Sequence, residues 1–324
     1  MTDRSAPDMI GSAGFGPDAW RREGAVDWPT LWVMAATYLV WVLALWVIAP
    51  LSVPLAILVL SLAVTQHSSL QHEVLHGHPF RLRWLNELLV SLPVGLCFPY
   101  GRFRDTHLAH HRDELLTDPY DDPESNFMDP AVWERQSRGR RMLLRWNNTL
   151  LGRMAIGPAL GVTSFAAQDL AAIRAGDRAI LRDWILHVIG LVVVFWIVAQ
   201  SPMPVWAYLI GAYLGLSLLK IRTYLEHRAH LKARCRTVVV ERGGPGPFAI
   251  LPFLFLNNNL HVVHHAKPNV AWYHLPALYR AGREDWLKRN ETYVYPSYAA
   301  IFRAHLVKAK DPVPHPLYPP KGQG

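Results

Sequence analysis

The sequence has few charged residues and almost no cysteine. Asp, Glu, Lys and Arg make up 18% of the 324 residues, whereas about 25% is usual. Two windows, residues 28–72 and 184–219, contain none of the four. A soluble domain does not leave such long stretches without charge, so the windows exclude a purely soluble enzyme. The charged remainder excludes a protein that lies almost wholly within a membrane.

The two cysteines, Cys97 and Cys235, are too few for a disulfide framework, a zinc motif or an iron–sulfur cluster. The sequence also has no glycine fingerprint for a flavin or nicotinamide cofactor and no heme attachment motif. A redox reaction carried out by this chain would therefore need electrons from a separate protein.

Each charge-free window is typical of a transmembrane helical hairpin. In the first, the apolar stretches Leu31–Ala49 and Leu55–Gln71 flank a proline-containing break at residues 50–54. In the second, Trp184–Ala199 and Val205–Leu219 flank a similar break. A helix of about 20 apolar residues crosses the bilayer core, so the sequence predicts four spans. The alternative, two buried hairpins in a soluble protein, is disfavoured by their length and uncharged turns.

The distribution of Lys and Arg predicts the orientation of these spans. Neither break carries a basic residue, whereas basic residues lie near the opposite ends: Arg21, Arg22, Arg81, Arg83, Arg178, Arg182, Lys220 and Arg222. The positive-inside rule then places both termini and the middle segment in the cytoplasm. The predicted fold is an all-α membrane protein with two transmembrane hairpins under a helical cytoplasmic cap. Its divisions are an N-terminal segment (1–29), a first hairpin (30–71), a first cap segment (72–183), a second hairpin (184–219) and a second cap segment with the C-terminal tail (220–324).

Histidine is abundant, with 16 residues, and most of them lie in four clusters. The clusters are His72/His76/His78, His107/His110/His111, His261/His264/His265 and the looser pair His227/His230. Residues three or four apart share a helix face, so the spacing within each of the first three clusters directs imidazoles to one side. A turn at Gly77 would bring His78 back toward the same point. This pattern predicts metal binding.

Three kinds of metalloprotein were compared with this pattern. The run His72-Glu73-x-x-His76 matches the zinc-protease signature with Glu73 as general base, but it leaves the other clusters unused, and zinc takes at most four ligands. A metal transporter or sensor would need ionisable residues along its spans, where only His67 and His187 are found. Nine or ten imidazoles suit two metals of higher coordination number. Together with an apolar substrate that comes from the membrane, they indicate two irons that activate dioxygen. A carboxylate-type di-iron site would need more Glu-x-x-His motifs.

In these residues the sequence resembles the integral-membrane fatty acid desaturase and hydroxylase superfamily, whose three histidine boxes follow two hairpins in this order. The resemblance covers about residues 30–280. Flanking segments resemble bacterial desaturases and hydrocarbon oxygenases: Leu116-Thr117-Asp118-Pro119 with Asp122-Pro123-Glu124, Tyr224-Leu225-Glu226-His227, and His265-x-x-Pro268 with Trp272-Tyr273.

The resemblance implies two Fe²⁺ ions at the membrane–cytosol boundary. The implied metal ligands are His72, His76, His78, His107, His110, His111, His227, His261, His264 and His265, with the roles of His78 and His230 left open. Metal-bound imidazoles are oriented by outer carboxylates or carbonyls. The sequence candidates for that role are Asp105, Asp113, Asp118, Asp122 and Glu226, for which surface charge or turn capping is the alternative.

The implied reaction is O₂-dependent desaturation of a fatty acyl lipid or acyl thioester. A hydroxylase or ketolase and an alkene-forming decarboxylase remain alternatives, because the same histidines serve all of these reactions. The expected partners are membrane lipid and a ferredoxin- or cytochrome-type electron donor with its reductase, and no motif indicates nucleic acid. The net charge of +8 has two interpretations: it reflects membrane topology, or it allows the protein to bind an acidic electron donor or anionic lipid headgroups. The densest basic patch is Arg138-Gly139-Arg140-Arg141 with Arg145. The expected location is a bacterial inner membrane.

Overall fold

Four long helices form the membrane-spanning portion of the computed structural model, which describes residues 26–112, 116–229 and 237–318. They are long and apolar enough to cross a bilayer, which confirms the prediction of an all-α protein with four spans. The helices are α1 (Trp28–Leu43) with its π-helical continuation η1 (Ala44–Ile48), α2 (Val53–Leu75), α9 (Arg178–Ala199) and α10 (Val205–Thr223).

Capping side chains determine where three of these helices begin. Asp27 accepts a hydrogen bond from the backbone N–H of Thr30 and caps α1, and Ser52 caps α2 in the same way. Asp177 caps α9, so this helix begins six residues before the charge-free window, at Arg178. Side-chain acceptors at these positions satisfy N–H groups that have no partner within the helix. The boundaries of the five predicted divisions stay a prediction.

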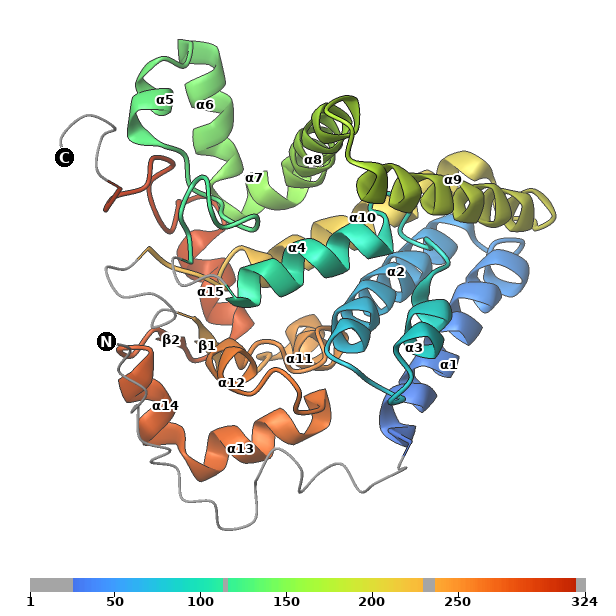
Figure 1. The fold of residues 1–324 in the computed structure, drawn as a ribbon. Helices are drawn as coiled ribbons and strands as arrows, with labels where there is room; N and C mark the ends of the chain where they lie inside the picture. The colour runs from blue at the N-terminus through green and yellow to red at the C-terminus, as the bar shows by residue number, and fades with distance from the viewer. Residues whose placement is uncertain (1–25, 113–115, 230–236, 319–324) are drawn as a thin grey trace.

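The helices α2 and α10 pack together at the centre, while α1 and α9 lie outside them (Figure 1). Two glycines one turn apart, Gly211 and Gly215, make the close approach possible. A Cβ atom at Gly211 would lie 2.6 Å from Leu60, and one at Gly215 would lie 2.6 Å from Val64. Small residues at this spacing let the backbones of membrane helices approach. The outer helices instead expose apolar side chains such as Trp32 and Val192, as lipid-facing helices do.

The remaining elements form a mainly helical cap on one end of the bundle. Before α9 they are α3 (Arg83–Val90), α4 (Tyr100–Arg112), α5 (Pro130–Glu134), α6 (Arg138–Asn147), α7 (Leu150–Ala155) and α8 (Gly157–Arg174). After α10 they are β1 (Val239–Val240), η2 (Gly246–Ile250), α11 (Leu251–Leu254), α12 (His261–Ala266), η3 (Trp272–His274), α13 (Leu275–Ala281), α14 (Arg283–Arg289), β2 (Val294–Tyr295) and α15 (Tyr298–His305). The strands β1 and β2 pair in parallel, with Val239 opposite Val294.

A buried apolar cluster fastens the cap to the end of α10. Ile221 and Leu225 pack there with Leu254 of α11 and Ile301 of α15. Tyr293, which lies just before β2, packs in the same cluster. This packing brings the segments that follow α10 back over the ends of α2 and α4 (Figure 1). The histidine clusters therefore meet although they are far apart in the sequence.

Candidate metal centre

Three helices carry the histidines into the interior. His72 lies in the last turn of α2, and His76 follows directly as its C-cap. His107, His110 and His111 lie along α4, and His261, His264 and His265 lie on α12. His227 follows the end of α10. The i, i+3 and i+4 spacings hold because each set is on one helix or at its end, as the sequence predicts.

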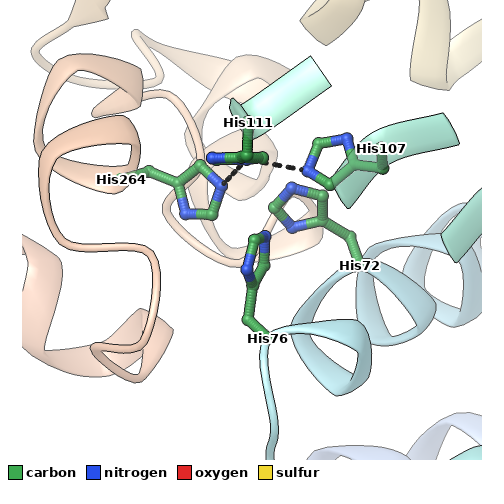
Figure 2. A group of neighbouring side chains, drawn as sticks. All are labelled: His72, His76, His107, His111 and His264. Carbon is green, nitrogen blue, oxygen red and sulfur yellow. Dashed lines mark hydrogen bonds between the residues drawn. The ribbon is translucent and has the colours of Figure 1, made fainter. Parts of the chain in front are cut away.

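Five imidazoles converge to form a first histidine group, which consists of His72, His76, His107, His111 and His264. Their rings point toward one another in Figure 2, with ligand atoms all within 4.8 Å of each other. The Nε2 atoms of His107 and His111 lie 3.0 Å apart, and those of His111 and His264 lie 3.2 Å apart. The Nε2 atoms of His72 and His76 are buried and have no hydrogen-bond partner.

A second histidine group consists of His110, His227 and His265, with His261 at its edge. The Nε2 atom of His227 lies 2.9 Å from that of His110 and 3.2 Å from that of His261. The Nε2 atom of His265 has no partner. The rings of His111 and His265 stack with centroids 4.3 Å apart, so the two groups adjoin.

Acceptor side chains outside the groups hold the Nδ1 atoms. His107 Nδ1 lies 2.8 Å from Glu124 Oε1, and His110 Nδ1 lies 2.7 Å from Asp122 Oδ1. His261 Nδ1 lies 3.0 Å from Asn258 Oδ1, and the Nδ2 amide of Asn258 donates to Glu226 Oε1. An Nδ1 that donates to an oxygen leaves the Nε2 lone pair of a neutral ring free to bind a metal.

The donor atoms fit metal ions in geometry and in chemistry. Imidazole nitrogens bind a metal at about 2.1 Å, so two such ligands at a right angle lie about 3 Å apart, as several Nε2 pairs do here. The buried Nε2 atoms of His72, His76 and His265 have no hydrogen-bond partner. Unpartnered buried polar atoms are rare in folded proteins and demand an explanation. The two groups can therefore hold two metal ions with nitrogen ligands.

Burial and mutual repulsion keep most of these imidazoles neutral. Burial, followed by the charges of neighbouring histidines, lowers the pKa of His76, His264 and His265 well below its usual value. His110 differs: burial opposes its charge, but Glu124 and Asp122 outweigh burial and raise the pKa of His110 to about 9. Metal binding at His110 would therefore release a proton.

The structure does not bring His78 to the other nine histidines. Its Nδ1 lies 3.0 Å from Asp27 Oδ2 and its Nε2 lies 3.2 Å from the carbonyl of Asn269. Glu73 Oε1 lies 3.8 Å from the same Nε2 and accepts the backbone N–H of Trp272. We call these residues the Asp27–Glu73–His78 cluster. The turn at Gly77, which has a positive φ of 94°, directs His78 to the capping carboxylate of α1 instead of back to the histidines.

Of the predicted carboxylates, some lie beside the histidines and others lie away from them. Asp122 bonds His110, and Glu226 lies 4.0 Å from His261 Nδ1. Asp105 lies away from the groups, half-exposed beside Arg104 at 2.7 Å. Asp118 accepts the backbone N–H groups of Tyr120 and Asp121 and so closes a surface turn. Asp113 and His230 lie outside the described residues.

Two residues that contact Nδ1 atoms of the histidines, Glu124 and Asn258, are not among the orienting residues predicted from the sequence. Glu124 lies two residues after the predicted candidate Asp122, in a turn rich in Asp and Pro. This closeness to Asp122 is the sequence signal that could have identified it. Asn258 lies three residues before His261 in the run of three asparagines. An asparagine at that spacing reaches the same helix end, which is the signal that could have identified it.

Four spans beneath two groups of buried histidines define an integral membrane protein with a candidate metal centre at the end of its helices. The chain matches the family described as Fatty acid desaturase over residues 45–297, a segment that contains all ten predicted histidine ligands. The chain therefore belongs to this family, and the protein is an oxidoreductase of the desaturase and hydroxylase type that acts on a lipid substrate. The comparison with curated proteins gives no match.

Proposed function

We propose that the protein is a di-iron, O₂-dependent fatty acyl desaturase that introduces a double bond into a hydrocarbon chain. The observation that carries this proposal is the set of buried, facing Nε2 atoms in two adjoining histidine groups. Family membership supports iron as the metal and an acyl chain as the substrate. An intramembrane protease is disfavoured because His72 and His76 belong to a five-histidine group and Glu73 is engaged by Trp272.

In this proposal the first histidine group holds one iron and the second group holds the other. Iron held by these histidines would supply the redox chemistry with dioxygen that attack on an unactivated C–H bond requires. Asp122, Glu124 and Asn258 keep the protons of His110, His107 and His261 on Nδ1. Their role is to orient the rings, as outer partners of metal-bound imidazoles do.

Apolar side chains flank His72 near the end of α2. Leu70 and Val74 lie on the same helix as His72 and pack with Leu256 and Trp272 in a buried cluster. A hydrocarbon chain is accommodated by apolar walls with few polar groups. We propose that the acyl chain reaches the histidines from the bilayer along the side chains of this apolar cluster.

We further propose that the cap and both termini face the cytoplasm of a bacterial cell, with the spans in the inner membrane. Support comes from the uncharged hairpin turns and the basic residues at the opposite ends of the spans. A separate carrier would then deliver electrons to the cap from the cytoplasm.

Lipid profiling tests the proposed reaction. The gene is expressed in a bacterial host grown with saturated fatty acids, and total acyl chains and hydrocarbons are analysed by mass spectrometry. A host that expresses the inactive variant His264→Ala serves as the control. We expect new monounsaturated acyl chains with the parent protein alone. New alcohols, ketones or terminal alkenes in their place would replace desaturation by one of the other reactions.

A further inference from the structure

The helices α5 and α6 stand out from the cap and bury none of their side chains. Figure 1 shows them at the side of the molecule opposite α1 and the far end of α9. This position separates the α5–α6 hairpin from the portion of the protein that lies in the bilayer. The α5–α6 hairpin therefore presents an exposed surface on the aqueous side of the cap.

Five arginines give the hairpin a concentrated positive charge: Arg135, Arg138, Arg140, Arg141 and Arg145. Among the residues that the structure describes, no carboxylate lies within ion-pair distance of any of them. Arg141 and Arg145 lie over the ring of Trp133, at 5.7 Å and 5.6 Å from its centroid. Stacking on an aromatic ring holds a guanidinium in place without neutralising it.

Apolar side chains are exposed beside these arginines. Met142 is 72% exposed, and Leu143 and Trp146 are about half-exposed on the same helix. Arginine, methionine and tryptophan are the residue types enriched at protein–protein interfaces. A helix that presents all three residue types, with arginines that no described carboxylate neutralises, fits a protein partner of opposite charge.

A short hydrogen-bonded route connects the end of α6 with the second histidine group. The Tyr224 hydroxyl donates to the carbonyl of Asn148, the C-cap of α6, at 3.1 Å, and accepts the backbone N–H of Lys310 at 2.9 Å. The Lys310 ammonium donates to the carbonyl of His227 at 3.0 Å. Asn148, Tyr224, Lys310 and His227 all line one polar pocket of about 30 Å³. The hairpin therefore adjoins the region of the cap that leads to His227.

We propose that the α5–α6 hairpin docks a small acidic one-electron carrier protein, whose electrons enter the second histidine group beside His227. This inference rests on the proposed function, because O₂-dependent desaturation consumes two external electrons per turnover. Each carrier molecule gives up one electron and is oxidised, and the metal centre is reduced. Charge complementarity steers such encounters and makes them dependent on ionic strength.

Charge reversal on the hairpin tests the proposal. The triple variant Arg138→Glu/Arg140→Glu/Arg145→Glu is compared with Arg280→Glu/Lys288→Glu/Arg289→Glu, which changes the charge equally on exposed positions of α13 and α14. Turnover is measured with an acidic [2Fe–2S] ferredoxin and its reductase as the probe. We expect the KM for ferredoxin to rise at least about tenfold in the hairpin variant. The control and the parent should share one KM, which should increase with salt.

Two further measurements separate this proposal from the proposed function. Protein reduced anaerobically with dithionite and then exposed to O₂ should give the same product yield per iron pair in the hairpin variant as in the parent. No product from any protein would contradict the proposed function, whereas an unchanged KM in the hairpin variant would overturn the docking surface alone. The corresponding Arg→Gln triple variant should show a smaller rise. An effect seen only in nanodiscs of anionic lipid would show that the hairpin binds the bilayer and would also overturn the proposal.

Discussion

The protein buries histidines in two kinds of surroundings, the two histidine groups and the Asp27–Glu73–His78 cluster, and their ring nitrogens are arranged in opposite ways. In the two histidine groups, Nε2 atoms face one another or have no partner, as for His72 and His76. In the Asp27–Glu73–His78 cluster, both ring nitrogens of His78 face oxygen atoms. His76 and His78 are only two residues apart.

This difference shows which property distinguishes a metal ligand from a structural histidine. Burial is the same, since His76 and His78 are both buried. The presence of nearby carboxylates is also shared, because Asp122 and Glu124 adjoin the histidine groups. What differs is whether acceptor atoms satisfy one nitrogen of the ring or both. A ring bonded at both nitrogens ties chain segments together, and a ring bonded at one retains a lone pair for a metal.

Removal of a histidine from either group should have the largest effect. His110→Ala and His264→Ala each delete one imidazole that faces others, so we expect iron binding to fall and oxidation to drop more than about 100-fold, beyond the 10–100-fold typical of outer partners. Iron per protein by atomic spectrometry and product yield are the measurements. His305→Ala is the control, since His305 bonds Tyr295 away from the groups. Full activity in either variant would contradict the proposed ligand set.

Loss of an outer carboxylate should have an intermediate effect. Asp122→Asn weakens the acceptor that holds His110 Nδ1 at 2.7 Å, and we expect iron affinity to fall about 10–100-fold. The same change at Asp118, which only closes a surface turn, is the matched control. Competition with a chelator of known affinity gives the measurement. Equal affinities in the two variants would mean that Asp122 does not tune the centre.

His78 gives the sharpest contrast between the two clusters. His78→Gln should leave iron per protein unchanged while lowering stability by about 1–3 kcal/mol, because Asp27 loses a buried donor. His76→Gln should lose iron. Iron content and the thermal midpoint are measured on both variants in parallel. Iron loss in His78→Gln to the level of His76→Gln would place His78 among the ligands, as the sequence pattern suggested.

The spacing of histidines predicted which side chains share a helix face, because i, i+3 and i+4 positions lie on one side of a helix. Which of these histidines bind metal stays a prediction. The four spans followed equally from length and missing charge. The position of His78 could not be obtained in this way, since it depends on Asp27, which lies 51 residues earlier and meets His78 only after α1 packs on α2. Asp105 shows the same limit: it is only two residues before His107 in the sequence but lies beside Arg104 on the outside of α4.

The smallest expected effect concerns the pH dependence of the Asp27–Glu73–His78 cluster. Burial alone would raise the pKa of Asp27, but hydrogen bonds from His78 and Thr30 outweigh burial and lower it. A carboxyl with a lowered pKa in the folded state contributes stability above its unfolded pKa of about 3.9, and this contribution is lost as the pH falls through the folded pKa. In metal-stripped protein, Asp27→Asn should therefore melt a few degrees below the parent at pH 6–7, and the gap should close below about pH 4. Thermal midpoints of both proteins across this range give the measurement. A gap that stays constant through pH 4 would mean that the carboxylate charge does not stabilise the cluster, and its contrast with the histidine groups would then rest on hydrogen-bond geometry alone.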